Sequence, residues 1–246
     1  MGLTPMMQQY LEIHEKVKEA ILFFRLGDFY EMFFDDALKA SKELEIALTG
    51  RDCGLDEKAP MCGVPYHAAE TYITKLVEKG YKVAICEQVE DPSVAKGIVK
   101  REVIRVISPG TIADGKLLES KKNNYLMSLC QEKNVMGLAY MDISTGDFFV
   151  TEISGKNIQA LLMDEVSKIG PAEILVNPNL FKNTEIIKTL EEKFSIMTNL
   201  YPGKYFEYKS SEERLKEQFD VYSLTALDLE RRELSVRAAG ALLKYI

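Results

Sequence analysis

The sequence RLGDFYE at residues 25–31 decides how the first part of this chain is interpreted. It follows an apolar run of β-favouring residues at 20–24, which predicts a buried strand, and it precedes residues 33–45, whose pattern predicts a helix. The heptapeptide is therefore predicted to connect a strand to a helix. Phe29 and Glu31 are two residues apart, so they share a face if the chain between them is extended. A large aromatic side chain then lies beside a carboxylate.

Packing alone offers an alternative interpretation of this pair. Phe29 would belong to the hydrophobic core, as most aromatic residues do, and Glu31 would stabilise the first turn of the next helix through the helix dipole. Spacing does not choose between the two interpretations.

Four sequence blocks, in order, resemble the mismatch-recognition domain of the MutS family of DNA mismatch repair proteins. They are FFRLGDFYEMFFDDA at 23–37, PMCGVPYHA at 60–68, VAICEQVEDP at 83–92 and KGIVKREVIRVISPGT at 96–111. The resemblance implies that the chain recognises mispaired or unpaired bases in double-stranded DNA from the minor groove. In the family a Phe stacks on the mispaired base and a Glu hydrogen-bonds to it, and the matching residues here are Phe29 and Glu31.

The chemistry of this pair suits that task. An apolar wedge unstacks a base step at a cost of roughly a few kcal/mol, and the cost is lower where pairing is already defective. An ionised carboxylate repels the phosphate backbone and accepts hydrogen bonds without donating them. It therefore weakens binding to intact duplex more than binding to a displaced base that offers a donor.

Composition predicts a folded protein of two domains. The chain has 246 residues, of which 46% are hydrophobic and 28% are charged, enough for two separate cores. Neither a signal peptide nor an apolar run of membrane-spanning length is present, so we expect a cytoplasmic protein. The four cysteines lack the spacing of a CxxC pair and are interpreted as reduced thiols, with a structural zinc site as the alternative.

A net charge of −7 argues against non-specific coating of DNA, so DNA binding must rely on local contacts. The best basic stretch is residues 96–105, where four basic side chains accompany one glutamate. The resemblance adds Arg51 at a position that approaches DNA. Tyr66 and His67 precede a predicted helix whose first amides could meet a phosphate. We expect Arg51, Tyr66, His67 and Lys96 to contact the DNA backbone, with a plain surface or packing role as the alternative for each.

The first domain is predicted to span residues 1–109 as a mixed α/β mismatch-recognition domain. Residues 51–58 and 61–67 are interpreted as loops, the second because it combines Gly63 with Pro65. Helices are expected at 4–17, 33–45 and 68–78, and strands at 20–24, 45–49, 81–87 and 102–108.

The sequence GTIADGK at residues 110–116 fits the GxxxxGK spacing of a phosphate-binding loop directly after a strand. The next residue is Leu117, at the position where Ser or Thr must ligate Mg²⁺, so nucleotide binding is not expected here. We interpret residues 110–123 as the linker between the two domains.

Residues 124–246 are predicted to form an α/β domain with a central, partly parallel sheet. The order of its elements resembles the connector domain of the MutS family, which has a ribonuclease H-like fold. Strands are expected at 125–130, 135–142, 148–153 and 173–176, and helices at 158–169, 183–194 and 227–246.

The ribonuclease H-like fold brings a rival function. Nucleases built on it hold two metal ions with several carboxylates, the first on the opening strands, and Asp142 occupies the equivalent position with Asp147 and Glu152 nearby. Asp147 is also an ordinary turn residue, and no second acidic cluster converges from the later helices. A metal-dependent nuclease is therefore the enzyme alternative, and a scaffold module for repair partners is the third possibility.

The resemblance covers nearly the whole chain but only the first two domains of the family. Members continue into an ATPase domain, so we expect a fragment that has no cofactor or metal and is not an enzyme, whereas the full-length protein uses ATP and Mg²⁺ and forms a homodimer. The fragment is expected to be a monomer. Its expected partners are double-stranded DNA with mismatches or small loops and, through the connector domain, a MutL-type protein, with no membrane association.

Overall fold

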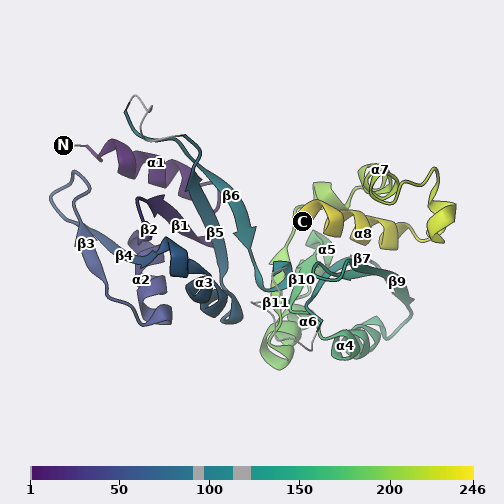
Figure 1. Ribbon diagram of the computed structural model, residues 1–246. Helices are drawn as coiled ribbons and strands as arrows, with labels where there is room; N and C mark the ends of the chain where they lie inside the picture. Colours follow the sequence, from purple (N-terminus) through teal and green to yellow (C-terminus); the bar gives the residue numbers. More distant parts are fainter. Residues whose placement is uncertain (1, 91–96, 113–122) are drawn as a thin grey trace. The chain divides into compact units, whose positions relative to one another are not determined.

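The computed structural model describes residues 2–90, 97–112 and 123–246. The chain divides into two compact units, Met1–Pro109 and Gly110–Ile246 (Figure 1). Each unit combines a sheet with helices, which confirms the α/β fold class with two domains. None of the described helices is long and apolar enough to cross a membrane.

In the described residues of the first unit, six strands form one mixed sheet in the order β3-β4-β2-β1-β5-β6. β1 pairs in parallel with β5, and the other neighbours are antiparallel. Figure 1 shows α1 on one side of this sheet and α2 and α3 on the other. The strands are β1 (Ala20–Leu26), β2 (Phe29–Phe33), β3 (Thr49–Arg51), β4 (Ala59–Pro65), β5 (Lys82–Gln88) and β6 (Arg101–Ile107), and the helices are α1 (Pro5–His14), α2 (Phe34–Leu44) and α3 (Ala69–Glu78).

The buried carboxylate of Asp36 connects the helices α1 and α2 to this sheet through hydrogen bonds. Asp36 Oδ2 accepts hydrogen bonds from the backbone N–H of Leu22 (2.8 Å) and from Tyr10 Oη (3.3 Å), and it lies 3.2 Å from His14 Nε2. Burial and the neighbouring Asp36 raise the pKa of Tyr10 far above its usual value, so its hydroxyl remains a donor. One side chain thus connects α1, α2 and β1.

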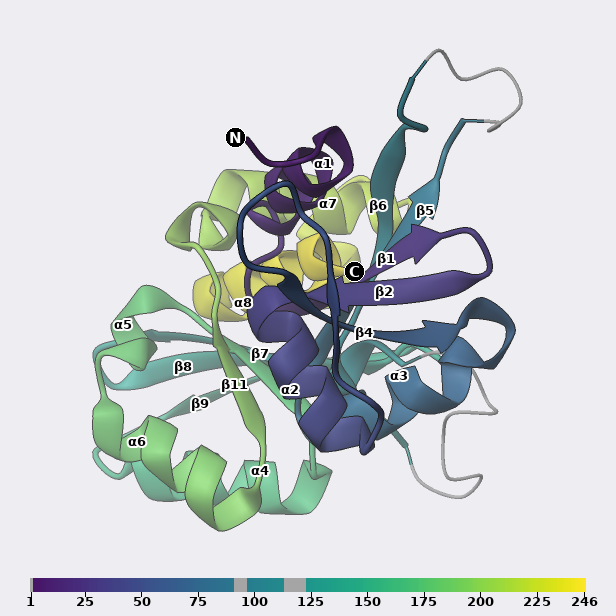
Figure 2. The same cartoon turned by 90° about the vertical axis from the view of Figure 1, so that its left-hand side faces the viewer.

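Residues 25–31 form a hairpin rather than the predicted connection from strand to helix. Leu26 of β1 pairs with Phe29 of β2 across the two-residue turn Gly27-Asp28, and Gly27 has a φ of 57°, a left-handed conformation that glycine adopts without steric cost. Figure 2 shows the two strands side by side with β4 alongside β2. Phe29 and Glu31 therefore belong to a central strand.

Two further expectations for the first unit were wrong. Residues 61–67 are not a loop, because most of them lie in β4, which pairs with β2 on one side and β3 on the other. The strand expected at 45–49 is displaced to Thr49–Arg51, since Glu45 ends α2 with a φ of 56° and the chain does not pair again until Thr49. The expected helices and the strand pair β5–β6 are confirmed, apart from shifts at their ends.

In the described residues of the second unit, five strands form a sheet in the order β11-β10-β7-β8-β9. β11, β10 and β7 are parallel, and β7, β8 and β9 are antiparallel, which confirms a partly parallel sheet. The strands are β7 (Tyr125–Glu132), β8 (Val135–Asp142), β9 (Asp147–Ser154), β10 (Glu173–Val176) and β11 (Met197–Leu200), and the helices are α4 (Ile158–Ile169), α5 (Pro178–Phe181), α6 (Thr184–Lys188), α7 (Tyr208–Gln218) and α8 (Glu233–Tyr245).

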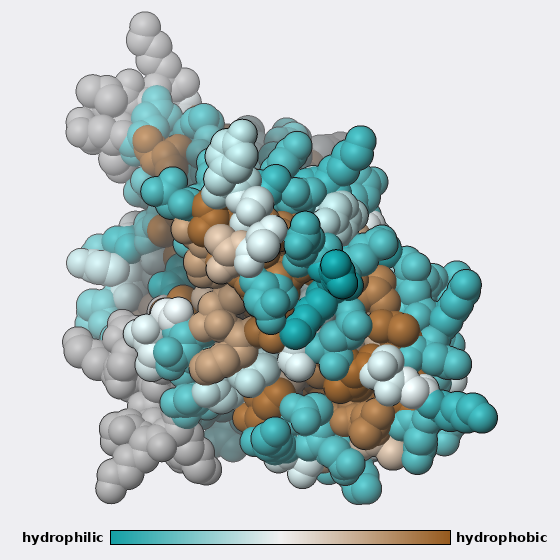
Figure 3. All heavy atoms as spheres, turned by 90° about the vertical axis from the view of Figure 1, so that its right-hand side faces the viewer, coloured by the Kyte–Doolittle hydropathy of each residue, from teal (hydrophilic) through white to brown (hydrophobic). Residues whose placement is uncertain are grey.

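Helices cover both faces of this sheet. On one face α8 packs against alternate strand residues such as Leu126 and Ala139, and on the other α4 packs against their neighbours Met127 and Leu138. Gly137 is required where α8 crosses β8, because a Cβ there would lie 2.1 Å from the carbonyl carbon of Leu234. On the side of the molecule drawn in Figure 3, apolar side chains are interrupted by hydrophilic ones.

A second buried carboxylate, Glu173, joins distant parts of this unit. Its Oε2 accepts the N–H of Gly110 (3.0 Å), and its Oε1 accepts Asn199 Nδ2 (2.6 Å) and Tyr245 Oη (2.6 Å). Glu173 is fully buried at the start of β10. The first residue of the unit and its last helix therefore bond to one side chain.

The sequence interpretation missed several elements here. α5, α7 and β11 were not expected, and the last helix begins at Glu233 rather than residue 227, since residues 224–227 form a separate 3-10 turn and Asp228 has a φ of 55°. Most of the expected linker, including the GxxxxGK segment from residue 113 onward, lies outside the described residues.

Candidate nucleic-acid interface

Phe29 and Glu31 lie on one face of β2, together with Phe33. Phe33 is fully buried beneath Tyr10 of α1, with the two rings 5.0 Å apart, whereas Phe29 at the other end of the strand is 46% exposed. The same row of side chains thus passes from the core to the surface. The interpretation of Phe29 as a core residue is wrong, and the structure presents its ring to solvent beside Glu31.

β2 is paired with β1 on one side and with β4 on the other, and β4 forms the floor beside Phe29 and Glu31. Glu31 is opposite Phe24 on β1 and Gly63 on β4. A Cβ at Gly63 would lie 3.3 Å from the carbonyl oxygen of Tyr30, 3.5 Å from Glu31 Cγ and 3.8 Å from Phe29 Cδ1. A larger side chain at this position would press on both residues of the pair.

Glu31 is held by Arg51. Arg51 Nη1 donates a hydrogen bond to Glu31 Oε2 at 2.5 Å, across the intervening strand β4. The Glu31 side chain is 15% exposed and that of Arg51 is 39% exposed. Phe29, Glu31 and Arg51 therefore form one continuous group, which we call the wedge surface.

The opposite face of the hairpin is braced by Arg25. Its guanidinium lies over the Tyr66 ring, 3.8 Å from the centroid, and its Nε donates to the carbonyl of Gly27 at 2.6 Å. Arg25 Nη1 lies 3.6 Å from Glu87, which also accepts a hydrogen bond from the Tyr30 hydroxyl. Burial and the bond to Glu87 raise the pKa of Tyr30 to about 12.

Tyr66 and His67 lie where β4 ends. Both side chains are exposed, their rings are perpendicular at 5.9 Å, and they open a 3-10 turn that precedes α3. The N–H of Tyr66 donates to the carbonyl of Asp28 at 2.9 Å, so this turn also fixes the hairpin tip. Tyr66 follows Pro65, which is opposite Phe29, but its ring packs under Arg25 on the face of the hairpin away from Glu31.

The basic stretch at 96–105 differs from the expectation. Lys96 lies outside the described residues. Arg101 is only 7% exposed, donates from Nε to the carbonyl of Arg25 at 2.7 Å and stacks over Phe24, so its charge holds the sheet together rather than facing solvent. Lys100 is paired with Glu102 at 2.6 Å.

Three residues with a clear place around the wedge surface were missed: Arg25, Gly63 and Glu87. The turn Gly27-Asp28 between two apolar runs is a hairpin signal that would have revealed β2, and with it the face on which Gly63 lies. Contacts of Arg25 with Tyr66 and Glu87 join two strands and the 3-10 turn before α3, and no local pattern shows them.

In the second unit, Asp142 ends β8 and shapes the following turn. Its Oδ1 accepts the N–H (2.9 Å) and hydroxyl (2.6 Å) of Ser144, and its Oδ2 accepts the N–H of Asn124 (3.0 Å). Burial acts to raise the pKa of Asp142, but these hydrogen bonds outweigh it and hold the pKa below its usual value. Both oxygens therefore accept hydrogen bonds within the unit, Oδ1 from the turn and Oδ2 from Asn124.

The other acidic residues of the nuclease alternative do not join Asp142 in a metal site. Asp147 is bonded to Thr145 Oγ1 at 2.8 Å, and Glu152 is opposite Gly137, five pairs along the ladder from Asp142. Within the described residues, no three His, Cys, Asp or Glu side chains are grouped to hold a metal ion.

The cysteines of the two units are buried free thiols. They are Cys53, Cys62 and Cys86 in the first unit and Cys130 in the second.

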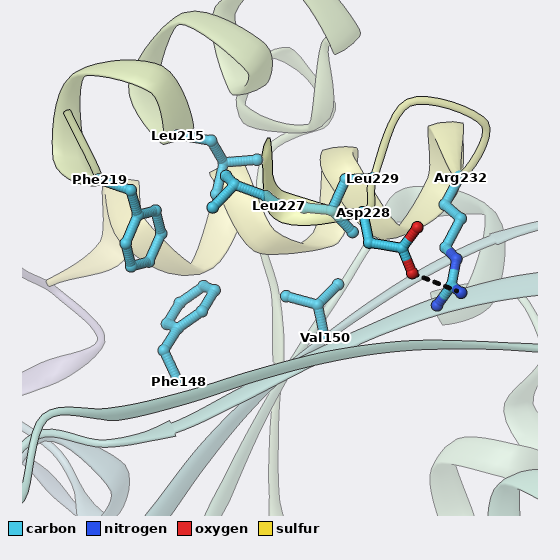
Figure 4. A pocket seen from close by; sticks show the side chains of 8 residues that line it. All are labelled: Phe148, Val150, Leu215, Phe219, Leu227, Asp228, Leu229 and Arg232. Carbon is cyan, nitrogen blue, oxygen red and sulfur yellow. Dashed lines mark hydrogen bonds and ion pairs between the residues drawn. The ribbon is translucent and has the colours of Figure 1, made fainter. Parts of the chain in front are cut away.

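The second unit also carries a small groove between β9 and the α7–α8 region (Figure 4). Its volume is about 260 Å³, and the rings of Phe148 and Phe219 meet at one end, 5.5 Å apart. Asp228 and Arg232 are paired at 3.5 Å at the other end. The groove is apolar at one end and charged at the other.

Comparison with known proteins identifies both units. Residues 4–116 match the family model described as MutS domain I, and residues 124–246 match MutS domain II. The chain is 54% identical over 245 residues to the DNA mismatch repair protein MutS of Acetivibrio thermocellus and 55% identical over 246 residues to that of Alkaliphilus oremlandii. These matches cover 100% and 99% of the chain but 28% of each relative. The chain belongs to the MutS family.

Proposed function

We propose that the first unit recognises mispaired or unpaired bases in double-stranded DNA, as part of DNA mismatch repair. Phe29 stacks on the base from the minor groove, and Glu31 accepts a hydrogen bond from it. The observation that carries this proposal is a half-exposed phenylalanine on a central strand, beside a partly buried carboxylate and at the opposite end of the row from the buried Phe33.

Rigidity of the hairpin supports the wedge role. Inserting a ring between base pairs costs roughly a few kcal/mol of unstacking, so a mobile side chain would lose further free energy on ordering. Phe29 is instead carried by a strand that is paired on both sides and braced from behind by Arg25. Defective pairing lowers the cost of insertion, which gives the selectivity.

The test is Phe29→Ala in the full-length protein, because the chain spans 28% of the length of its relatives and other parts contribute phosphate contacts. Loss of stacking worth roughly 1–3 kcal/mol should bring mismatch affinity down toward that for homoduplex. Fluorescence anisotropy at one fixed salt concentration measures both affinities. Phe181→Ala, which truncates an exposed phenylalanine of the second unit, is the matched control.

A lowered melting temperature with an unchanged ratio of mismatch to homoduplex affinity would contradict the wedge assignment. Truncation of a buried phenylalanine costs roughly 3–5 kcal/mol of stability, so the two outcomes are well separated. Tyr66 and His67 are proposed as backbone contacts next to the wedge, and Lys96 as a further one.

We also propose that the second unit binds a MutL-type repair partner. The family resemblance and the exposed groove at Phe148 and Phe219 support this role. Phe219→Ser should reduce cross-linking to that partner while mismatch affinity is retained; unchanged cross-linking would remove the groove from the proposal. ATP, Mg²⁺ and homodimer formation are proposed for the cytoplasmic full-length protein, outside the residues matched here.

Nuclease activity is the weaker candidate because Ser144 and Asn124 already donate hydrogen bonds to both oxygens of Asp142. Incubation with Mn²⁺ or Mg²⁺ and branched or RNA-containing duplex tests it directly. Cleavage that is abolished by Asp142→Asn would establish the enzyme.

A further inference from the structure

The ion pair between Arg51 and Glu31 is not used by the proposed function. Arg51 ends β3, the edge strand of the described sheet, and its guanidinium reaches over β4 to Glu31 Oε2. Among the described residues, Glu31 Oε1 accepts no hydrogen bond. One oxygen of the carboxylate is therefore occupied, and the other remains an acceptor.

This contact is more constrained than an ordinary surface ion pair. Exposed pairs contribute little because both side chains are mobile and well hydrated. Here the Glu31 side chain is only 15% exposed, and its stem lies over Gly63, where the missing side chain leaves space. A hydrogen bond between two ionised groups is stronger than one between neutral groups, so Arg51 orients the carboxylate.

Arg51 also changes the charge that a DNA duplex meets. A bare carboxylate beside Phe29 repels the phosphates of any duplex, whether its bases are paired or not. With Arg51 attached, the wedge surface carries a neutral pair, while Oε1 still accepts a hydrogen bond from a displaced base. The arginine therefore removes an indiscriminate repulsion and keeps the discriminating contact.

We propose that Arg51 is a specificity-determining residue that acts through Glu31, holding its carboxylate oriented and charge-compensated, rather than a residue that grips the DNA backbone. The inference rests on the proposed function of Phe29 and Glu31. It differs from the expectation drawn from the resemblance, in which Arg51 contacts the backbone directly.

A double-mutant cycle in the full-length protein tests this coupling. Arg51→Met retains the aliphatic stem without the charge, and it is measured alone and with Glu31→Gln against mismatched and fully paired duplexes at one salt concentration. With Glu31 present, Arg51→Met should lower mismatch affinity about tenfold and homoduplex affinity about threefold, since only the first depends on orientation. With Gln at position 31, both affinities should change by the same factor.

A uniform loss on both duplexes and in both backgrounds would overturn the proposal, because a simple phosphate contact is independent of Glu31. If the melting temperature of Arg51→Met is lower than that of the wild type, Arg51→Gln replaces it in the same cycle. A larger loss on mismatched duplex that depends on Glu31 then supports the proposal, and a uniform loss overturns it. Phe29→Ala is titrated in parallel. An unchanged ratio for that variant refutes the proposed function itself, whereas a collapsed ratio together with uniform Arg51 effects refutes only the role of Arg51.

Discussion

Glu31 of the first unit and Asp142 of the second are both carboxylates on central strands next to a hairpin, but they differ in the donors around them. Glu31 has one partner, Arg51, and keeps one oxygen available. Asp142 accepts three hydrogen bonds from the turn that follows it and from Asn124, and it is almost fully buried. The number of donors that already bind a carboxylate, rather than its position on a fold, separates a side chain that is available to a ligand from one that shapes a turn.

The comparison extends to the two units. In the second unit the buried carboxylates Asp142 and Glu173 bond to groups of the same unit, and α8 lies close to the sheet at Gly137. The first unit presents an aromatic ring and a carboxylate on one face of a hairpin whose opposite face is braced by Arg25. Substitutions should therefore cost stability in the second unit and selectivity in the first.

The largest effect, a loss of stability in the second unit, is expected from Gly137→Ala. The added Cβ would lie within 2.3 Å of three backbone atoms of α8, so the helix must move, and the second unit should lose about 3 kcal/mol or more of unfolding free energy. Gly203→Ala is the matched control, because a Cβ there meets Pro178 at an ordinary distance of 3.5 Å. Denaturant titration compares the two variants.

Buried thiols report which unit opens in that experiment. Burial raises the pKa of Cys130 in the second unit to about 12 and that of Cys62 in the first to about 11, so both stay neutral and unreactive while packed. Gly137→Ala should expose Cys130 to alkylation at lower denaturant and leave Cys62 protected. Simultaneous labelling of both would contradict the separation into two units.

Asp142→Asn should have an intermediate effect. The substitution removes an acceptor from a buried turn and should lower the unfolding free energy by about 1–3 kcal/mol, with mismatch affinity unchanged. The pKa of Asp142 is lowered in the folded state, so its ionised form stabilises the protein above the usual aspartate pKa of about 3.9. This stabilisation disappears as the pH falls through the folded-state pKa, and the difference between wild type and variant should shrink there. A difference that is constant with pH would show that the turn does not depend on the charge.

The smallest effect is expected from Glu31→Ala. Removal of the carboxylate leaves Arg51 unpaired beside the DNA, so homoduplex affinity should rise about threefold while stability changes by less than about 0.5 kcal/mol. Glu43→Ala breaks another pair of the first unit, with Lys79 at 3.0 Å, and should not alter the affinity ratio. If homoduplex affinity rises in both variants, the cause is the change in net charge and not the loss of the carboxylate at position 31.

The sequence predicted most elements but not the strands that carry the site. β2 was missed because the run from residue 29 to 33 is short and leads directly into a helix, and β4 because Gly63 and Pro65 usually interrupt strands. Both strands are paired on two sides, and that pairing outweighs the local preference. The helices predicted at 158–169 and 68–78, which have clear helical periodicity, agree with α4 and α3 to within one residue.

The site shows the same limit. The resemblance marked Phe29 and Glu31, and their spacing placed them on one face. The bond between Glu31 and Arg51 crosses an intervening strand, so it depends on the sheet order β3-β4-β2, which no local pattern contains. The bonds from Asp142 to Ser144, by contrast, are local, because Ser144 follows it by two residues in the sequence.

The carboxylate of Glu173 has a mechanical consequence for the second unit. Gly110 and Tyr245 lie 135 residues apart in the chain, yet both bond to this one side chain. A force applied at Gly110 or at the end of α8 would therefore act first on the hydrogen bonds of Glu173 and only then on the hydrophobic contacts between the helices and the sheet. Through this one side chain, a force on one end of the unit reaches the other end.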